Sequence, residues 1–279
     1  IAIDRTFGSY YFLFELTGSA DWSLSTMLPA FHPDRPPRRL RPFQALHHFR
    51  ALARNADDTA QVFLMGECLP NRSTRRIGMD FCLSSLGQDL MVSEPALAPL
   101  LDDHERLLAF GPDSVAHAYV AFMRAEGLTA AGLVAASRFP GLVEYADQMQ
   151  WFVNRLRDTH DLVHVLTGYG RDPLGEQCVL GFTSGQYRDW TETIIAWAGT
   201  AEFALRVPGR APFIGAVAEA RRNGRAAQAI FRQNISALLA EPLAAARRRM
   251  GIGEPSVYRR AHARLREQGI DPYRIGGPA

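Results

Sequence analysis

Apolar residues recur at helical spacing along much of this 279-residue chain, and this pattern limits the folds that the chain can adopt. The clearest example runs from Asp113 to Gly127, where apolar residues stand at positions i, i+3, i+4, i+7 and i+8. They are Val115, Ala118, Tyr119, Phe122 and Met123, and Gly127 follows them as a helix stop. Alternating apolar and polar residues, which are typical of half-buried strands, are scarce. The sequence therefore predicts a mainly α fold with one principal domain.

Three further segments show the helical pattern. We expect a long helix from Tyr145 to Thr167, a helix that includes Ala196 to Arg206, and a third helix from Ala226 to Leu239. Gly168 is placed to end the first of these helices, and Pro242 is placed to close the third.

The ends of the chain differ from its middle. Residues 32–39 are rich in proline and arginine, so they cannot continue a helix or a central strand. We therefore expect an N-terminal segment with a Pro/Arg linker or surface strap at residues 1–41. A single helical domain is expected at residues 42–255, followed by a short basic C-terminal extension at residues 256–279.

Two histidines lie on the apolar face of the long helix expected at residues 145–167. His160 and His164 are one turn apart and share that face with Met149, Val153 and Leu156. The opposite face should point to solvent, because it carries polar residues, namely Asp147, Asn154, Arg155 and Asp158. Two buried imidazoles need partners for their ring nitrogens, and one metal ion would satisfy both. The alternative is a pair of hydrogen-bonded core histidines.

Two acidic residues accompany the histidine pair. Asp161 follows His160 directly, and Glu176 follows a glycine- and proline-rich turn that should place it in the first turn of the next helix. Two imidazoles and one or two carboxylates form a ligand set that suits zinc, iron(II), manganese or cobalt, of which zinc is our first choice. Asp161 is either a metal ligand or a general base. The second role is that of the glutamate in the H-E-x-x-H motif. In the alternative without a metal, Glu176 only caps its helix.

Several other chemistries are excluded by residues that the chain lacks. All 31 basic positions are arginine, so no lysine is present to form a Schiff base or to bind phosphate in a Walker motif. Neither G-x-S-x-G nor G-x-G-x-x-G occurs. Cys68, Cys82 and Cys178 are too widely spaced to indicate a disulfide framework or a zinc-thiolate site, which fits a reducing compartment.

Charge and apolar clusters suggest contact surfaces. Residues 206–279 hold 14 arginines and 5 acidic residues. We predict a surface for anionic lipid or partner proteins at Arg221, Arg222, Arg225, Arg247, Arg248 and Arg249. An ordinary solvated helical face is the alternative, and nucleic acid is not expected. Trp190, Ile194 and Trp197 are candidate lipid-binding residues, or else part of the core. The apolar stretch at residues 193–207 is too short to span a membrane.

The spacing of His160, Asp161, His164 and Glu176 resembles the signature of the coenzyme Q (ubiquinone) biosynthesis protein 4 family. The resemblance covers about residues 42–255, where several flanking segments agree. These are Ser93-Glu94-Pro95, the turn at residues 110–114 with Tyr119–Met123 after it, Arg155–Thr159, and residues 238–243 with the Gly251-Ile252 pair. Val115-Ala116 departs from the pattern, because a Leu-Gly pair is expected there.

The resemblance implies a function and a set of partners. It implies a mainly helical protein of ubiquinone biosynthesis that binds a divalent metal through His160, Asp161, His164 and Glu176. The implied reaction is oxidative decarboxylation and hydroxylation at ring carbon 1 of a polyprenylated hydroxybenzoate-type precursor. We expect a homodimer in the bacterial cytoplasm, peripheral to the inner membrane, that contacts other ubiquinone-biosynthesis proteins and prenyl lipid. The alternative is a non-catalytic scaffold that presents the prenylated precursor to other enzymes.

Overall fold

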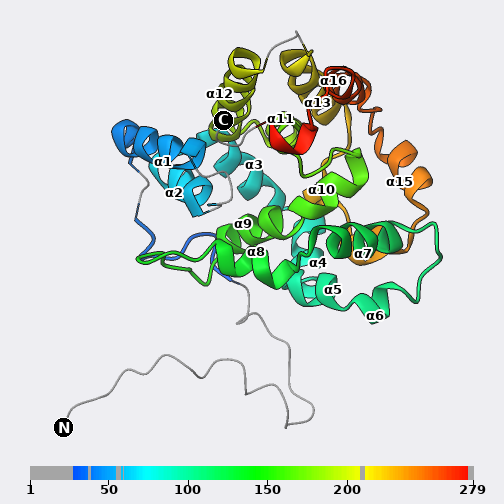
Figure 1. The fold of residues 1–279 in the computed structure, drawn as a ribbon. Coiled ribbons are helices and arrows are strands. Elements are labelled where there is room, and N and C mark those ends of the chain that lie inside the picture. Colours follow the sequence, from blue (N-terminus) through cyan, green and yellow to red (C-terminus); the bar gives the residue numbers. More distant parts are fainter. Residues whose placement is uncertain (1–27, 37–38, 55–57, 59, 208–210, 276–279) are drawn as a thin grey trace, which may run out of the picture.

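The computed structural model describes residues 28–36, 39–54, 58, 60–207 and 211–275. Sixteen α-helices and two short 3-10 helices make up the secondary structure of these residues, and no strand occurs among them. An isolated antiparallel bridge joins Ser114 to Pro242. The prediction of a mainly α fold is thus confirmed (Figure 1).

The helices have the following bounds. They are α1 Pro42–Arg54, α2 Ala60–Cys68, α3 Arg72–Cys82, α4 Ser85–Ser93, α5 Ala98–Asp102, α6 His104–Leu107, α7 Val115–Glu126, α8 Ala130–Ala136, α9 Gln148–Asp158, α10 His160–Thr167, α11 Pro173–Tyr187, α12 Trp190–Arg206, α13 Phe213–Ala226, α14 Ile235–Ala240, α15 Leu243–Met250 and α16 Ser256–Glu267, with 3-10 helices at Ile230–Arg232 and Pro272–Arg274. In Figure 1, α12, α13 and α16 lie above α10, whereas α4 to α8 lie below it.

Helix α11 is the centre of the core and packs against α12, α13 and α16. Small residues let α11 and α13 approach closely. A Cβ atom added to Gly224 of α13 would lie 2.0 Å from the carbonyl oxygen of Phe182 in α11. A Cβ atom on Gly185 would lie 2.6 Å from the carbonyl oxygen of Arg221. Larger residues at these two positions would therefore push the two helices apart.

Helix α7 forms where its apolar spacing predicts it. The Ser114 side chain accepts a hydrogen bond from the His117 backbone N–H and so caps the N-terminus. Gly127 ends the helix in the left-handed region, with φ 65°. The buried face of α7 packs against α10, so it supports one wall of the histidine pair.

Two of the predicted helices are wrong in their bounds. The segment at residues 145–167 begins as a helix only at Gln148 and is divided at Thr159 into α9 and α10, and the Thr159 hydroxyl donates to the Arg155 carbonyl 2.8 Å away. The expected helix at residues 226–239 is wrong as well. Asn234 stops any continuous helix there, because its side chain caps α14 by accepting from the Ala237 N–H.

The polar face of α9 is buried, which corrects the expectation that it points to solvent. Arg155 is 2% exposed, and its Nη1 lies 2.9 Å from Glu94 Oε2. Its other donors reach the backbone carbonyls of Phe231 and Gln233. Asp147 and Asp158 are also buried, and Asn154 is half-buried. Helical spacing indicates two chemically different faces, but it does not show that other elements cover both.

The segment that precedes α1 contacts the N-terminus of α9. Arg35 Nε lies 2.6 Å from Asp147 Oδ2, and the His32 backbone N–H donates to the same carboxylate at 2.9 Å. Burial alone would raise the pKa of Asp147, but Arg35 and the backbone N–H groups of His32 and Gln150 together outweigh it and lower this pKa. We call residues 28–36 the strap because they lie against α9, whereas the N-terminal segment expected at residues 1–41 stays a prediction, since residues 1–27 and 37–38 lie outside the described part of the chain.

The basic C-terminal extension belongs physically to the core. Ala261 and Leu265 of α16 are fully buried, and α16 packs against α13. The predicted limits at residues 41 and 255 stay a prediction, but no gap in packing separates α16 from the rest of the described chain. All three cysteines are buried and free.

Candidate metal centre

Helix α10 brings the two predicted histidines together at its start. His160 Nε2 and His164 Nε2 are 3.3 Å apart. Ligand-type atoms of His160, Asp161 and His164 all lie within 4.8 Å of one another. Asp161 is 6% exposed, and its carboxylate has no hydrogen-bond or ion-pair partner among the residues that the structure describes. Asp161 lines the large cavity, so its carboxylate can meet water or a cation there.

Glu176 reaches the same point from the next helix. Gly168, with φ 77°, ends α10, and the chain turns so that Glu176 lies in the first turn of α11. Glu176 Oε2 is 3.5 Å from Nε2 of His160 and 3.5 Å from Nε2 of His164. The turn requires glycine at position 175, because a Cβ atom there would lie 1.9 Å from the Gly170 carbonyl oxygen. Gly168 and Gly175 therefore allow the tight turn that brings Glu176 to the two histidines.

The ring of His164 is held in one orientation. Its Nδ1 lies 3.1 Å from the Tyr169 carbonyl oxygen, which can only accept, so Nδ1 carries the hydrogen. This leaves the lone pair of Nε2 directed toward Glu176 when the ring is neutral. Phe122 of α7 stacks on the imidazole, with ring centroids 5.3 Å apart. A backbone carbonyl that accepts from the second ring nitrogen, as the Tyr169 carbonyl does here, is common behind histidines at metal sites.

The electrostatics of the centre favour positive charge between the histidines and the acids. Burial alone would lower the pKa of His160, but the neighbouring Glu176 and Asp161 carboxylates raise it to about 9. Burial would raise the pKa of Glu176, whereas His164 and His160 lower it well below its usual range. Arg171 adds a contact, with its Nε 3.4 Å from Glu176 Oε1. A divalent cation could take the place of the histidine protons.

Three of the four predicted ligands, His160, Asp161 and His164, form a group that could hold a metal ion, and Glu176 lies 3.5 Å from both imidazoles. The structure supplies two imidazole nitrogens, a carboxylate oxygen that lies near both nitrogens, and the partnerless carboxylate of Asp161. This donor set suits zinc, iron(II), manganese or cobalt and is unlike a thiolate structural site. The site also leaves room on one side, because His160 and Glu176 line a large cavity.

A buried cluster that the sequence analysis missed holds the turn before Glu176. Asp172 is fully buried and caps α11 by accepting from the Gly175 N–H. It also accepts a hydrogen bond from the Tyr258 hydroxyl, and its Oδ1 lies 3.0 Å from His262 Nε2. The Asp-Pro pair at residues 172–173 is typical of a helix start, so the sequence could have predicted Asp172 as the N-cap of α11. No sequence signal links this turn to α16.

The cavity beside the centre has a volume of about 2380 Å³ and is bounded by α9, α10, α11, α12, the α1–α2 pair and the strap. Apolar side chains form much of the wall near the histidines, among them Val153, Leu156, Leu180 and Ile195. Glu192 also lines the cavity, and the sequence analysis did not single it out. The space is large enough for a ring with a long apolar tail.

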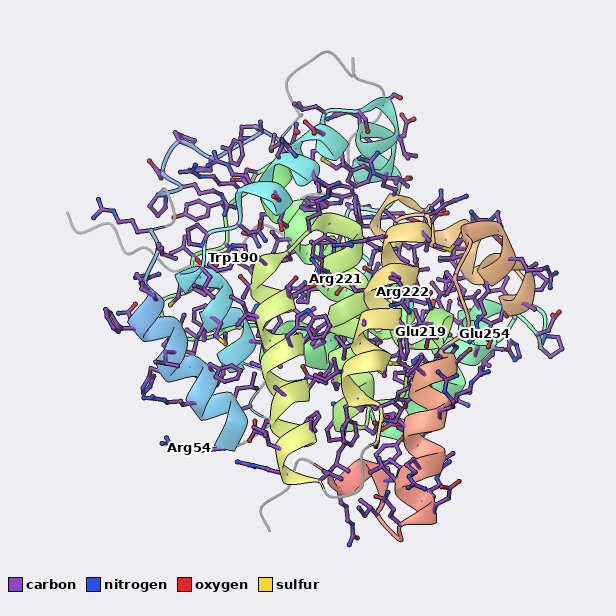
Figure 2. All side chains as sticks on the ribbon, turned by 90° about the horizontal axis from the view of Figure 1, so that it is seen from above. Arg54, Trp190, Glu219, Arg221, Arg222 and Glu254 are labelled. Atoms are coloured by element: carbon purple, nitrogen blue, oxygen red, sulfur yellow. The ribbon has the colours of Figure 1, made fainter. Side chains whose placement is uncertain are left out.

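The three candidate lipid-binding residues lie elsewhere. Trp190, at the start of α12 (Figure 2), and Ile194 are each 40% exposed. Trp197 is half-buried and packs against the core. These three side chains, all within the described part of the chain, do not line the cavity of the histidines.

Two of the six arginines predicted to form a contact surface have structural partners instead. Arg247 donates to the Leu166 and Val165 carbonyls at 2.8 and 2.9 Å, and so caps the C-terminus of α10. Arg249 pairs with Glu241 at 2.7 Å. The remaining four are Arg221, Arg222 and Arg225 on α13, of which Figure 2 labels Arg221 and Arg222, and Arg248 on α15.

No helix in the described part of the chain is long and apolar enough to cross a membrane. This agrees with the expectation for the stretch at residues 193–207, most of which lies in α12.

Comparisons with known proteins agree with the resemblance seen in the sequence. A crystal structure of a protein assigned to ubiquinone biosynthesis, from Nostoc punctiforme PCC 73102, superposes with a TM-score of 0.59 at 17% identity. The match covers 77% of this chain and 100% of that chain, and at this identity it shows a shared fold. None of the curated proteins matches the chain. The family described as Coenzyme Q (ubiquinone) biosynthesis protein Coq4 matches residues 43–256. The chain therefore belongs to this family, which implies a role in ubiquinone biosynthesis.

Proposed function

We propose that the protein carries out a metal-dependent oxidative decarboxylation and hydroxylation at ring carbon 1 of a polyprenylated hydroxybenzoate-type precursor. The observation that carries this proposal is the convergence of His160, His164 and Glu176 beside a large, partly apolar cavity, which His160 and Glu176 line. Family membership supports the pathway, and the donor set supports a metal.

The side chains have distinct roles in this proposal. His160, His164, Glu176 and Asp161 would hold the divalent metal, which supplies a Lewis acid for a ring carboxylate or phenolate when it is bound. The Tyr169 carbonyl keeps His164 in the tautomer that can bind the metal. Asp161, if it is not a ligand, is placed to accept a proton. Val153, Leu156 and Leu180 would keep water from the ring, while the rest of the cavity takes the prenyl tail.

Release of carbon dioxide tests the proposal. Metal-loaded protein is supplied with oxygen and a prenylated 4-hydroxybenzoate labelled in its carboxyl group. We expect labelled carbon dioxide together with a ring that carries a new hydroxyl group. A His160→Ala/His164→Ala variant should release none. An inactive wild type, or a double variant as active as wild type, would refute the proposal.

A non-catalytic scaffold for prenyl lipid is the second candidate function, and the exposed Trp190 and Ile194 favour it. In this case a homodimer at an anionic membrane surface would present the precursor to other ubiquinone-biosynthesis proteins, and Trp190, Ile194 and Trp197 would bind lipid. Binding to anionic vesicles should then weaken at high salt and in an Arg222→Gln/Arg225→Gln variant. A folded metal-ligand variant that still binds lipid and partners but releases no carbon dioxide would argue against this candidate.

A further inference from the structure

We propose that Glu192 forms a second polar contact in the cavity and binds the ring hydroxyl that lies para to the carboxyl group of the aromatic ligand. The inference rests on the proposed function, because it assumes that the carboxyl group is held at the metal centre. In this role, Glu192 would make the protein bind hydroxybenzoates more tightly than benzoates that lack the hydroxyl group.

One face of α11 connects the metal centre to Glu192. Glu176, Leu180, Thr183 and Tyr187 are separated by four, three and four residues, so at about 100° per residue they share one face. All four side chains line the cavity. Thr183 stands seven residues after Glu176, which corresponds to about 10 Å along the helix axis. This separation is comparable to the length of a para-hydroxybenzoic acid together with one metal–oxygen bond.

The contacts of Glu192 fit a neutral carboxyl group. Its Oε2 lies 2.7 Å from Thr183 Oγ1, and its Oε1 accepts a hydrogen bond from the Tyr187 hydroxyl. Thr183 Oγ1 also lies 3.0 Å from the Val179 carbonyl oxygen, which can only accept. The Thr183 hydroxyl has a single proton. That proton goes either to Glu192 Oε2 or to Val179, and in the second case the contact at 2.7 Å requires a proton on Glu192. The contacts thus accommodate a neutral carboxyl group.

The surroundings of Glu192 favour the same protonation state. Burial and the nearby Asp189 carboxylate raise the pKa of Glu192 to about 8, against the opposing effects of Tyr187, Thr183 and His160. A neutral acid has a physical advantage here. An ionised Glu192 would repel a substrate carboxylate bound in the same cavity, whereas a neutral carboxyl accepts a phenolic O–H without that repulsion.

Glu192 is held in place and is still accessible. Thr183 and Tyr187 are buried, whereas Glu192 is only half-buried and borders the cavity. Each carboxyl oxygen has a further lone pair for a ligand hydroxyl. Between the two polar ends, Leu180 and Ile195 form an apolar stretch of wall. A metal centre, an apolar wall and a neutral acid match, in this order, the carboxyl, ring and hydroxyl of a hydroxybenzoate.

Two probes that differ by one hydroxyl group test the inference. The dissociation constants of 3-farnesyl-4-hydroxybenzoate and 3-farnesylbenzoate are measured by calorimetry on zinc-loaded wild type. One neutral hydrogen bond should make the hydroxylated probe bind roughly 5- to 10-fold more tightly. Glu192→Gln should keep this preference, because the amide still offers an acceptor, and Glu192→Leu should bind both probes equally. Thr183→Val, which frees the Glu192 carboxyl, should reduce the preference.

The matched control is Glu202→Gln, a second glutamate of α12 that lines the cavity and pairs with Arg206. It should keep the preference of the wild type. Equal affinity of wild type for both probes would overturn the inference and leave the proposed function standing, as would an unchanged preference in folded Glu192→Leu. If Glu192→Leu does not fold, an unchanged preference in Thr183→Val has the same meaning. Failure of both probes to bind wild type would overturn both proposals.

Discussion

Glu176 and Glu192 border one cavity, yet their carboxyl groups titrate in opposite directions. Burial raises the pKa of each, but only Glu176 faces two imidazoles, and His164 and His160 lower its pKa well below the usual range. Glu192 faces Asp189 and two hydroxyl groups, and its pKa rises to about 8. The same residue type is therefore ionised at one end of the cavity and neutral at the other.

The comparison teaches that the partners of a buried acid, more than its burial, decide its chemistry. An ionised carboxylate beside two imidazoles is suited to a cation. A neutral carboxyl beside hydroxyl groups is suited to a polar neutral group. Four experiments test this difference between the two carboxyl groups.

Loss of a histidine should have the largest effect. We expect His164→Ala to weaken zinc binding by more than about 100-fold, because removing a direct ligand exceeds the effect of losing an outer-shell partner. Calorimetry with zinc measures this change. His47→Ala, on the exposed side of α1, is the control and should bind zinc as wild type does. Equal zinc affinity of wild type and His164→Ala would show that α10 is not a metal site.

Disruption of the buried Asp172 cluster should have the second-largest effect on zinc binding. Asp172→Asn removes the charge that Tyr258 and His262 contact, so the turn before Glu176 should loosen. We expect zinc affinity to fall roughly 10- to 100-fold. Unfolding measurements should show a loss of about 1–3 kcal/mol. In Asp103→Asn, which alters an exposed cap far from the centre, zinc affinity should not change. A destabilised Asp172→Asn protein with full zinc affinity would limit the cluster to a structural role.

The pH dependence of zinc binding should be about tenfold per pH unit. The pKa of His160 is raised to about 9 in the metal-free protein, so zinc must displace a proton below that pH. Zinc affinity should therefore rise with pH and level off near pH 9. In the metal-free protein, the contribution of His160 to stability is complete below its unfolded pKa, near 6.5, and is lost as the pH rises through about 9. Zinc affinity that does not change between pH 6 and 8 would contradict this proton exchange.

Glu192→Gln should have the smallest effect. The folded pKa of Glu192 lies above its unfolded value, so ionisation in the unfolded chain destabilises the native state progressively from about pH 4.5 to 8. The glutamine variant should thus melt a few degrees higher than wild type at pH 8 and at the same temperature near pH 4. Its zinc affinity should stay within about twofold of wild type, whereas Glu176→Gln should lose most of its zinc binding. A lower melting temperature at pH 8 would mean that Glu192 is ionised.

The helical class followed from the sequence, and so did the convergence of the two histidines with Glu176, whereas their role as metal ligands stays a prediction. Residues one turn apart on a helix must share a face, so His160 and His164 were predictable from local geometry. The turn to Glu176 was readable as well, since glycine and proline restrict the backbone directly. Local spacing also predicted α7 and its glycine cap.

Only the tertiary structure decided which polar residues are buried and what they face. The sequence pattern predicted that Arg155 and Asp158 face solvent. In the structure both are buried, and Arg155 pairs with Glu94 from a distant part of the chain. Arg247, whose role at a lipid surface stays a prediction, also caps α10, a contact that its spacing did not indicate. The contacts of Asp172 with α16 and of Glu192 with α11 join separate helices. Periodicity describes one helix at a time, and the protonation of a buried acid depends on the neighbours that packing brings to it.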